Sequence, residues 1–202
     1  KDTRVNLIRR VGRSGLASAI KEGLLNSTGD FAILMDADGQ HQPKDVLNAI
    51  NKLRNKKVDL VAGSRFMKKA NIVGLSSRRQ EGSSFANALS RFSLPKKYSH
   101  LTDYMSGCLA INLKTCMPII YMVDVNGFKF YYELLAVSKG SLDVDEVPLT
   151  FQPRLYGQSK LDISILWDFI ISFIHTFSFR ILPRRSISFA IVGATGIVIQ
   201  LT

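Results

Sequence analysis

Residues 31–41 read FAILMDADGQH, in which five apolar residues are followed by two carboxylates, Asp36 and Asp38, that stand one residue apart. An apolar run of this length predicts a short buried strand. The carboxylates would then lie at the carboxyl end of the strand, where open α/β sheets bind their ligands. Mg²⁺ and Mn²⁺ prefer oxygen ligands and complete their coordination with substrate phosphates. The pattern therefore indicates a metal-dependent enzyme that acts on a phosphorylated donor.

The residues after the carboxylates strengthen this interpretation. An Asp-x-Asp triplet by itself is also common in loops and helix caps. Pro43 can occupy the first position of a helix, so the carboxylates would lie on a strand-to-helix turn. We expect His41 to line this turn.

The chain outside this turn predicts alternating strands and helices. Apolar runs and helical periodicity give expected strands at residues 5–8, 31–35, 58–65, 108–111 and 144–148, and expected helices at residues 14–25, 44–55, 84–92 and 128–139. The strand at 144–148 is expected at an edge of the sheet. This alternation predicts a three-layer α/β fold.

Composition limits the partners and the redox state. The chain has 202 residues, enough for one domain with a core, and a net charge of +11, which favours phosphates or an anionic membrane surface. We expect no nucleic-acid partner, because the chain has no zinc finger, RNA-binding aromatic signature or basic zipper region. The two cysteines, Cys108 and Cys116, lack metal-type spacing and are expected to be reduced and buried.

The last forty residues are strongly apolar. Residues 163–182 predict either an amphipathic helix at a membrane surface or a core helix. Residues 187–202 carry no charge, and Arg184 and Arg185 before them place that end on the cytoplasmic side of a membrane by the positive-inside rule. Because the chain begins without Met and stops inside an apolar run, we expect a fragment of a longer protein that is truncated at its N-terminus.

Several segments together resemble the dolichyl-phosphate mannose synthase-like, polyprenyl-phosphate glycosyltransferases of glycosyltransferase family 2. These segments are RVGRSGLASAI (10–20), MDADGQH (35–41), VAGSR (61–65), DYMSG (103–107), VPLTF (147–151) and RLYGQSKL (154–161). Residues 185–193 resemble the start of a GtrA-like membrane domain. The resemblance implies a nucleotide-diphospho-sugar transferase fold of the GT-A type, a three-layer α/β sandwich. It implies a catalytic domain over residues 1–160, an interfacial amphipathic helix over 161–183 and the start of a transmembrane domain over 184–202.

The resemblance also implies roles for individual residues. The expected metal ligands for Mg²⁺ or Mn²⁺ are Asp36, Asp38 and Gln40, and the alternative for Gln40 is a solvent-exposed turn residue. The expected catalytic residues are Asp38, Arg65 and Asp103. Arg65 resembles a phosphate-binding residue, and Asp103 is expected either to orient groups beside the acceptor or to form a helix cap or turn. The residues expected to contact donor or acceptor phosphates are Arg78, Arg79, Arg154, Ser159 and Lys160. Glu133 is expected to have a structural or donor-orienting role.

The implied reaction transfers a hexose from GDP-mannose or UDP-glucose to polyprenyl or dolichyl phosphate, with inversion at the anomeric carbon. The expected partners are a nucleotide sugar, polyprenyl phosphate and membrane lipids, with the catalytic domain on the cytoplasmic face of the membrane. Two alternatives stay open: a family 2 glycosyltransferase acting on a polysaccharide or glycan, and a non-catalytic basic membrane adaptor.

Overall fold

The computed structural model describes residues 2–12, 15–72, 77–125, 129–151 and 163–201. A mixed sheet forms its centre, with the order β1 (Phe31–Leu34), β4 (Leu109–Asn112), β2 (Leu60–Ser64) and β5 (Val144–Pro148). β4 is antiparallel to both β1 and β2, whereas β2 and β5 are parallel. Strands β1, β2 and β5 therefore run in one direction, and their carboxyl ends meet at one edge of the sheet, which β4 enters from its amino end.

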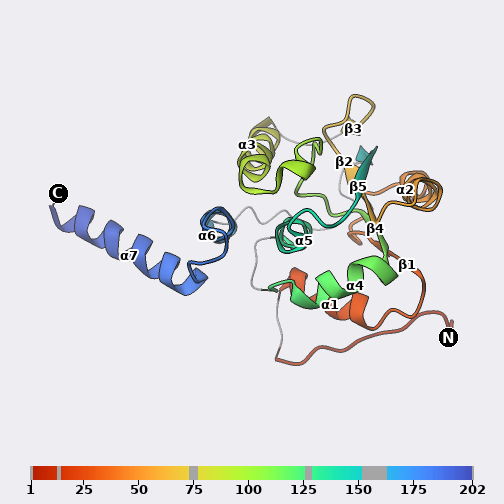
Figure 1. The fold of residues 1–202 in the computed structure, drawn as a ribbon, viewed down its shortest axis with the longest axis horizontal. Coiled ribbons are helices and arrows are strands. Elements are labelled where there is room, and N and C mark those ends of the chain that lie inside the picture. Colours follow the sequence, from red (N-terminus) through yellow and green to blue (C-terminus); the bar gives the residue numbers. More distant parts are fainter. Residues whose placement is uncertain (1, 13–14, 73–76, 126–128, 152–162, 202) are drawn as a thin grey trace.

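Helices cover both faces of this sheet, as the predicted three-layer fold requires (Figure 1). Helix α2 (Pro43–Lys56) packs on one face. Helices α1 (Leu16–Leu25), α4 (Leu113–Met122) and α5 (Phe130–Ser138) pack together on the other. The structure thus confirms the α/β class. It also confirms that residues 144–148 form an edge strand, within the part of the sheet that is described.

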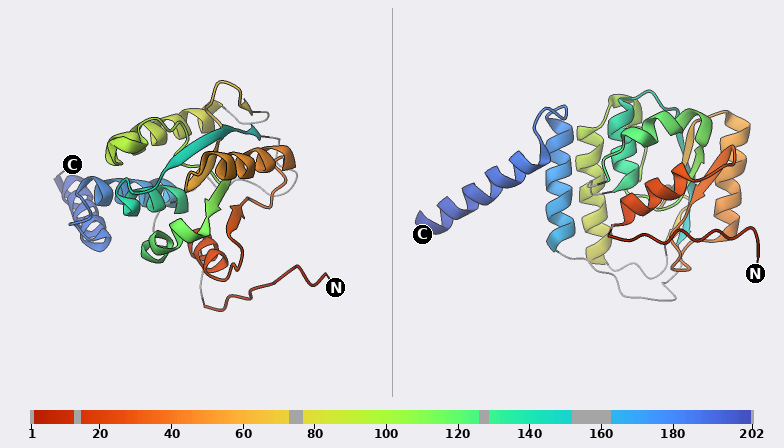
Figure 2. Two further views of the ribbon diagram at one scale, coloured as in Figure 1. Left: turned by 45° about the vertical axis from the view of Figure 1, so that its right-hand side comes forward. Right: turned by 90° about the horizontal axis from the view of Figure 1, so that it is seen from below.

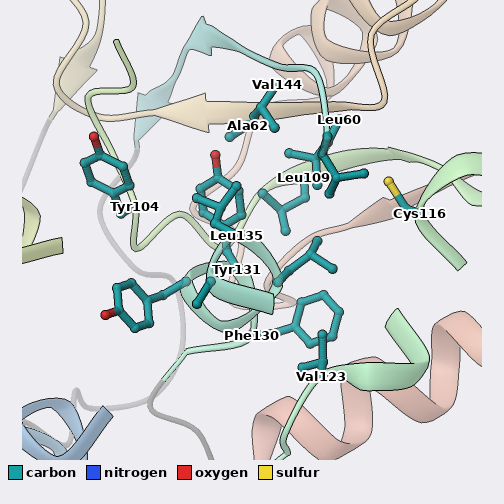
Figure 3. Close-up of a cluster of buried hydrophobic side chains, with 14 of the residues drawn as sticks. Leu60, Ala62, Tyr104, Leu109, Cys116, Val123, Phe130, Tyr131, Leu135 and Val144 are labelled. Atoms are coloured by element: carbon teal, nitrogen blue, oxygen red, sulfur yellow. The ribbon is translucent and has the colours of Figure 1, made fainter. Parts of the chain in front are cut away.

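The alternation of side chains along each strand divides the core between the two faces. Val61, Ala110 and Val147 are buried against Ala49 and Leu53 of α2. Their neighbours along the strands point to the opposite face, where the second cluster includes Leu60, Ala62, Leu109, Ile111 and Val144 (Figure 3). A shift of one residue in strand register would exchange these two sets, so this pattern fixes the pairing of the strands.

Helix α5 lies in the centre of the second cluster (Figure 3). Nearly all of its side chains are buried, including the acid Glu133 and the aromatic residues Tyr131 and Tyr132. The hydroxyl groups of Tyr132 and Ser93 are 2.7 Å apart, which connects α5 to helix α3 (Ser77–Ser93). A helix that is apolar on all sides is typical of a core position.

Helix α4 was not predicted from the sequence. Asn112 caps its amino end, because the Asn112 side chain accepts a hydrogen bond of 3.1 Å from the backbone N–H of Lys114. Pro118 lies inside the helix and cannot donate the usual backbone hydrogen bond. The proline made a helix unexpected from the local sequence, whereas the cap and the burial of Leu113, Cys116 and Ile120 stabilise the helix.

The strand predicted at residues 5–8 is wrong, because these residues pair with no strand of the described sheets. Val5 and Leu7 are exposed, so their apolar character reflects no burial here. Two short strands that were not predicted, β3 (Asn71–Ile72) and β6 (Thr150–Phe151), form a separate parallel pair. A short 3₁₀ helix, η1, covers Lys96–Tyr98.

The C-terminal region contains helix α6 (Ile163–Phe177) and helix α7 (Arg184–Leu201). The predicted continuous helix over residues 161–183 is wrong at its end, because Phe179 and Arg180 adopt positive φ angles and end α6. Helix α6 lies beside α3 and buries Phe169 and Ser172, whereas α7 extends away from the rest of the molecule (Figure 2). Among the described residues, no helix combines the length and the apolarity needed to cross a membrane.

Candidate active site

Three of the predicted site segments meet at the carboxyl-end edge of the sheet. Asp36 and Asp38 follow β1, and Arg65 follows β2. Asp103 belongs to the segment that leads into the antiparallel strand β4, so it reaches the same edge from the opposite direction. Residues separated by dozens of positions in the sequence are thereby gathered because β4 is inserted between β1 and β2.

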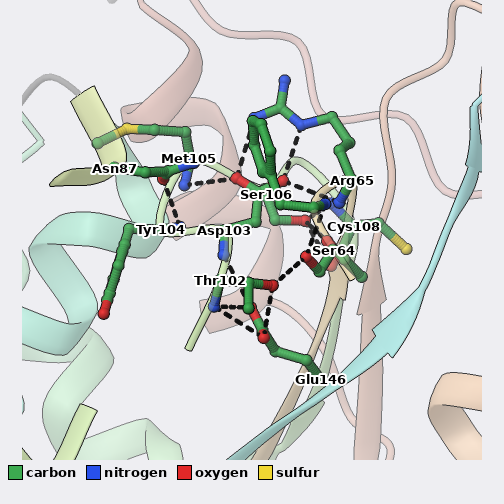
Figure 4. A network of polar contacts seen from close by, with 12 residues as sticks. Ser64, Arg65, Asn87, Thr102, Asp103, Tyr104, Met105, Ser106, Cys108 and Glu146 are labelled. Atoms are coloured by element: carbon green, nitrogen blue, oxygen red, sulfur yellow. Dashed lines mark hydrogen bonds and ion pairs between the residues drawn. The ribbon is translucent and has the colours of Figure 1, made fainter. Parts of the chain in front are cut away.

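Arg65 and Asp103 form a bidentate ion pair at this edge (Figure 4). The Nε of Arg65 donates to Oδ2 of Asp103 at 2.7 Å, and Nη2 donates to Oδ1 at 2.9 Å. The backbone N–H groups of Arg65 and Met105 donate to the same carboxylate at 3.2 and 3.1 Å. Asp103 is completely buried, and these four bonds engage both of its oxygens. Its geometry supports an orienting role for the carboxylate.

The charge of Arg65 is secured by its neighbours. Burial lowers the pKa of Arg65, but the hydrogen bonds and charge of Asp103, together with the charge of Asp36, outweigh burial and leave the pKa above its usual value. A planar guanidinium held in one orientation is suited to bidentate contact with a phosphate. The structure thus brings a fixed cation and the carboxylate of Asp36 into one electrostatic environment.

Asp36 lies against the backbone of Gly107. A Cβ atom added at Gly107 would be 2.5 Å from Oδ2 of Asp36, so this position has no room for a side chain unless Asp36 moves. Nε2 of His41 is 4.0 Å from the same oxygen, and the His41 side chain is almost fully buried. The Asp36 side chain remains 45% exposed, which leaves its carboxylate accessible to a ligand.

Asp38 and Gln40 shape the turn after β1. The backbone N–H of Gln40 donates to Oδ1 of Asp38 at 3.1 Å, and Gly39 between them has a φ of 78°. Gln40 is 8% exposed, so the alternative of a solvent-exposed turn residue is wrong. In the described part of the chain, no group of three or more His, Cys, Asp and Glu residues is placed to hold a metal ion. Two carboxylates with an amide oxygen fit a hard cation that takes its other ligands from water and phosphate.

Lys129 is a cation near the site that was not singled out from the sequence. It directly precedes α5, and its side chain is partly buried. Burial lowers the pKa of Lys129, the charge of Arg65 lowers it further, and the charges of Asp36 and Asp103 oppose this decrease. The ammonium group of Lys129 therefore lies within electrostatic range of Asp36, Arg65 and Asp103. A single lysine immediately before an almost wholly apolar helix was the available sequence signal.

A second polar network lies beneath Asp103 (Figure 4). Glu146 of β5 accepts hydrogen bonds from Thr102 and Asp103, and the hydroxyl groups of Thr102 and Ser64 are 2.5 Å apart. The backbone N–H of Tyr104 donates to the side chain of Asn87 on α3 at 2.9 Å. The segment that carries Asp103 is therefore held by the sheet on one side and by α3 on the other.

Glu133 has a structural environment away from these contacts. Its completely buried carboxylate pairs with Arg180 at 3.1 Å and also with Arg184. Nε of Arg184 donates in addition to Asp124 at 3.0 Å. These pairs connect α5 to α7 and to the turn before it, which agrees with the structural alternative for Glu133.

The other predicted phosphate-contacting residues lie in or next to segments outside the described part of the chain. Arg78 and Arg79 lie in the first turn of α3, but their side chains are outside the described part of the structure. Arg154, Ser159 and Lys160 lie outside the described residues. Cys108 and Cys116 are buried free thiols, as predicted, and burial raises their pKa values to about 11 and about 12, respectively.

Comparisons with known proteins agree with this architecture. Residues 1–115 match the model of glycosyl transferase family 2. The chain is 32% identical over 198 residues to a dolichol-phosphate mannosyltransferase of Pyrococcus furiosus, covering 97% of this chain and 54% of that protein. It is 31% identical over 183 residues to the dolichol-phosphate mannosyltransferase of Mycosarcoma maydis, covering 87% of this chain and 58% of that protein. The chain thus spans somewhat more than half the length of these curated relatives.

Solved structures share the fold at lower identity. Glucosyl-3-phosphoglycerate synthase from Mycobacterium tuberculosis, in complex with Mn²⁺, uridine diphosphate and glucosyl-3-phosphoglycerate, superposes with a TM-score of 0.56. That pair is 17% identical, and the match covers 83% of this chain and 55% of the synthase. The complex of the synthase with Mg²⁺ and uridine diphosphate gives a TM-score of 0.53 at 15% identity, covering 83% and 55% of the two chains. At these identities the likeness concerns the GT-A-like α/β fold.

Proposed function

This chain belongs to glycosyltransferase family 2, and we propose that it transfers a hexose from a nucleotide sugar to polyprenyl or dolichyl phosphate. The donor is GDP-mannose or UDP-glucose, and the anomeric carbon is inverted. The observation that carries the proposal is the convergence of Asp36 and the Arg65–Asp103 pair at one edge of the sheet. The dolichol-phosphate mannosyltransferases among its relatives support the choice of a lipid-phosphate acceptor.

The proposed donor side uses the turn after β1. Asp36, Asp38 and Gln40 would hold Mg²⁺ or Mn²⁺, which would neutralise the charge on the departing nucleoside diphosphate. The Asp36 carboxylate packs against Gly107, where a larger residue would displace it, and lies 4.0 Å from Nε2 of His41.

The proposed acceptor side uses Arg65. A phosphate monoester is already ionised near neutral pH, so its attack needs positioning and charge stabilisation more than a strong base. A phosphate oxygen forms the bond to the anomeric carbon while the bond from that carbon to the diphosphate oxygen breaks. Arg65 orients the acceptor phosphate, and Asp103 fixes the guanidinium. Because the acceptor phosphate is already ionised, the step needs no proton transfer to Asp103, whose oxygens accept four hydrogen bonds.

The other predicted residues complete this proposal. Arg78 or Arg79 contacts the acceptor phosphate, and Arg154, Ser159 and Lys160 contact the donor phosphates. Residues 1–160 form the catalytic domain, residues 161–183 dock it on the cytoplasmic leaflet, and residues 184–202 begin a GtrA-like membrane domain. Exposed Phe179 and Ile181, with the exposed cation Arg185 shortly after them in the chain, support docking, because apolar side chains near cations favour an anionic bilayer surface.

The test uses the full-length protein with labelled donor, Mn²⁺ and polyprenyl phosphate, and measures label in the lipid extract. Asp38→Ala is expected to reduce transfer by about 100-fold or more while preserving the melting temperature, because it removes a ligand from the donor side. Asp168→Ala, which changes an exposed acid on α6, is the matched control and should transfer normally. Unchanged transfer by Asp38→Ala would exclude the metal role. Label in a polysaccharide and none in the lipid extract would exclude polyprenyl phosphate as the acceptor.

A further inference from the structure

Glu146 is a buried acid that has no assigned part in the reaction. It lies on β5 with 5% of its surface exposed, beneath the segment that carries Asp103. The backbone N–H of Thr102 donates to its two oxygens at 2.9 and 2.8 Å, the hydroxyl of Thr102 donates at 2.9 Å, and the backbone N–H of Asp103 donates at 2.9 Å. A single carboxylate therefore holds two consecutive residues next to the site (Figure 4).

These contacts reach Arg65 by two routes. Through Asp103, the backbone that Glu146 holds carries the carboxylate that binds the guanidinium in two places. Through Thr102, a hydroxyl contact of 2.5 Å leads to Ser64, whose Oγ also accepts the backbone N–H of Phe66 at 3.1 Å. Glu146 thus fixes the backbone on both sides of Arg65 and the partner of its side chain.

We propose that Glu146 is a positioning residue that orients Arg65 toward the acceptor phosphate. This inference rests on the proposed function, because it takes Arg65 as the group that binds the acceptor. Glu146 itself does not touch the reacting atoms. Its effect is transmitted through Thr102 and Asp103 to the guanidinium.

The ionised form of Glu146 is the form that fits its surroundings. Three donor groups point at its two oxygens, and a carboxylate can accept all of them. A glutamine in its place would direct an amide N–H₂ toward at least one of these donors and leave that contact broken. Burial raises the pKa of Glu146 above its usual value, and the hydrogen bonds from Asp103 and Thr102 offset only part of that increase.

A purely structural role makes a different prediction. If Glu146 only stabilised the fold, Glu146→Gln would lower the melting temperature, and the folded enzyme would keep its kinetic constants. If it positions Arg65, the folded variant loses use of the acceptor and keeps its affinity for the donor. The acceptor and donor constants therefore separate the two roles.

The experiment compares Glu146→Gln with Asp145→Asn in the full-length enzyme. Asp145 is the neighbouring acid on β5, and it pairs with Lys52 and Lys56 on the opposite side of the strand. We expect Glu146→Gln to reduce kcat/KM for polyprenyl phosphate by about 10- to 100-fold, the range for outer residues that orient a ligand-binding group. The Kd for nucleoside diphosphate with Mn²⁺ should change less than about twofold, and Asp145→Asn should leave both constants unchanged. A folded Glu146→Gln enzyme with the wild-type acceptor constants would overturn the proposal.

Two further variants keep the test decisive. If Glu146→Gln does not fold, Thr102→Val removes the hydroxyl contacts to Glu146 and Ser64 and should still reduce acceptor kcat/KM, whereas Thr102→Ser should restore it. In an Arg65→Ala background, Glu146→Gln should cause no further loss, since its effect passes through Arg65. Wild-type acceptor use by Thr102→Val, or an additive loss in the double variant, would contradict the proposal. Absence of lipid-phosphate transfer by the wild-type enzyme would instead refute the proposed function.

Discussion

The buried Arg65–Asp103 pair gives a quantitative prediction for Asp103→Asn. The substitution preserves the shape of the side chain but removes its charge and places an amide N–H₂ where one oxygen accepts a hydrogen bond from Arg65. Arg65 would then keep its charge in a position where only 16% of its side chain is exposed. Breaking a buried ion pair by removing one partner costs about 3–5 kcal/mol. We therefore expect the free energy of unfolding to fall by about 3 kcal/mol, the lower end of this range, because asparagine keeps one acceptor oxygen.

Thermal and urea unfolding of the purified protein measure this effect. For a domain of this size, a loss of about 3 kcal/mol lowers the melting temperature by roughly 6–12 °C. Asp145→Asn is the matched control, because it makes the same chemical change in an acid that is 28% exposed and whose pairs with Lys52 and Lys56 are partly solvated. The control should lose no more than about 1 kcal/mol. If Asp103→Asn unfolds at the wild-type temperature, or no lower than the control, Asp103 does not hold Arg65 as described.

Three other changes test separate features. Gly107→Ala places a Cβ atom 2.5 Å from Oδ2 of Asp36 and should weaken the affinity for Mn²⁺ by about 10-fold or more, measured by calorimetry with nucleoside diphosphate. Unchanged Mn²⁺ affinity would contradict the proposed metal role of Asp36. Gly63→Ala places a Cβ atom 2.5 Å from the side chain of Leu149, so urea unfolding should show a loss of about 1–3 kcal/mol, and wild-type stability would disprove the close packing there. Cys108 and Cys116 should not react with iodoacetamide at pH 8 in the folded protein, and rapid labelling of the native protein would refute their burial. Their folded pKa values of about 11 and about 12 lie above the value of 9.0 for a free thiol, so the free energy of unfolding should fall as the pH rises above 9.

Local pattern was sufficient for the four strands of the central sheet and for the carboxylates that follow β1. The apolar run at residues 31–35 and the helix beginning at Pro43 were predicted correctly to within a residue. The contact between Arg65 and Asp103 was not predictable in this way, because it depends on β4 lying antiparallel between β1 and β2. Strand order is set by packing of the whole sheet, and periodicity within one segment carries no information about it.

Glu146 and Lys129 were not predicted to lie near the site for a similar reason. Glu146 follows Asp145 in the short strand β5, and the sequence does not reveal that backbone N–H groups from Thr102 and Asp103 converge on Glu146. Lys129 is separated from Asp36 by more than ninety positions in the sequence. The two charges come close enough to interact only after α5 has packed against the sheet. The strand predicted at residues 5–8 failed for the opposite reason, since an apolar pattern forms a strand only when a neighbouring strand satisfies its backbone groups.

The position of β4 between β1 and β2 also affects how the chain folds. The two members of the Arg65–Asp103 pair are 38 positions apart, and Glu146 lies a further 43 positions beyond Asp103. Such long loops must close before any of these hydrogen bonds can form, and loop closure slows folding. We expect the amide protons of Thr102 and Asp103 to gain protection from solvent exchange late during refolding, after those of α2 and α5, whose hydrogen bonds are local.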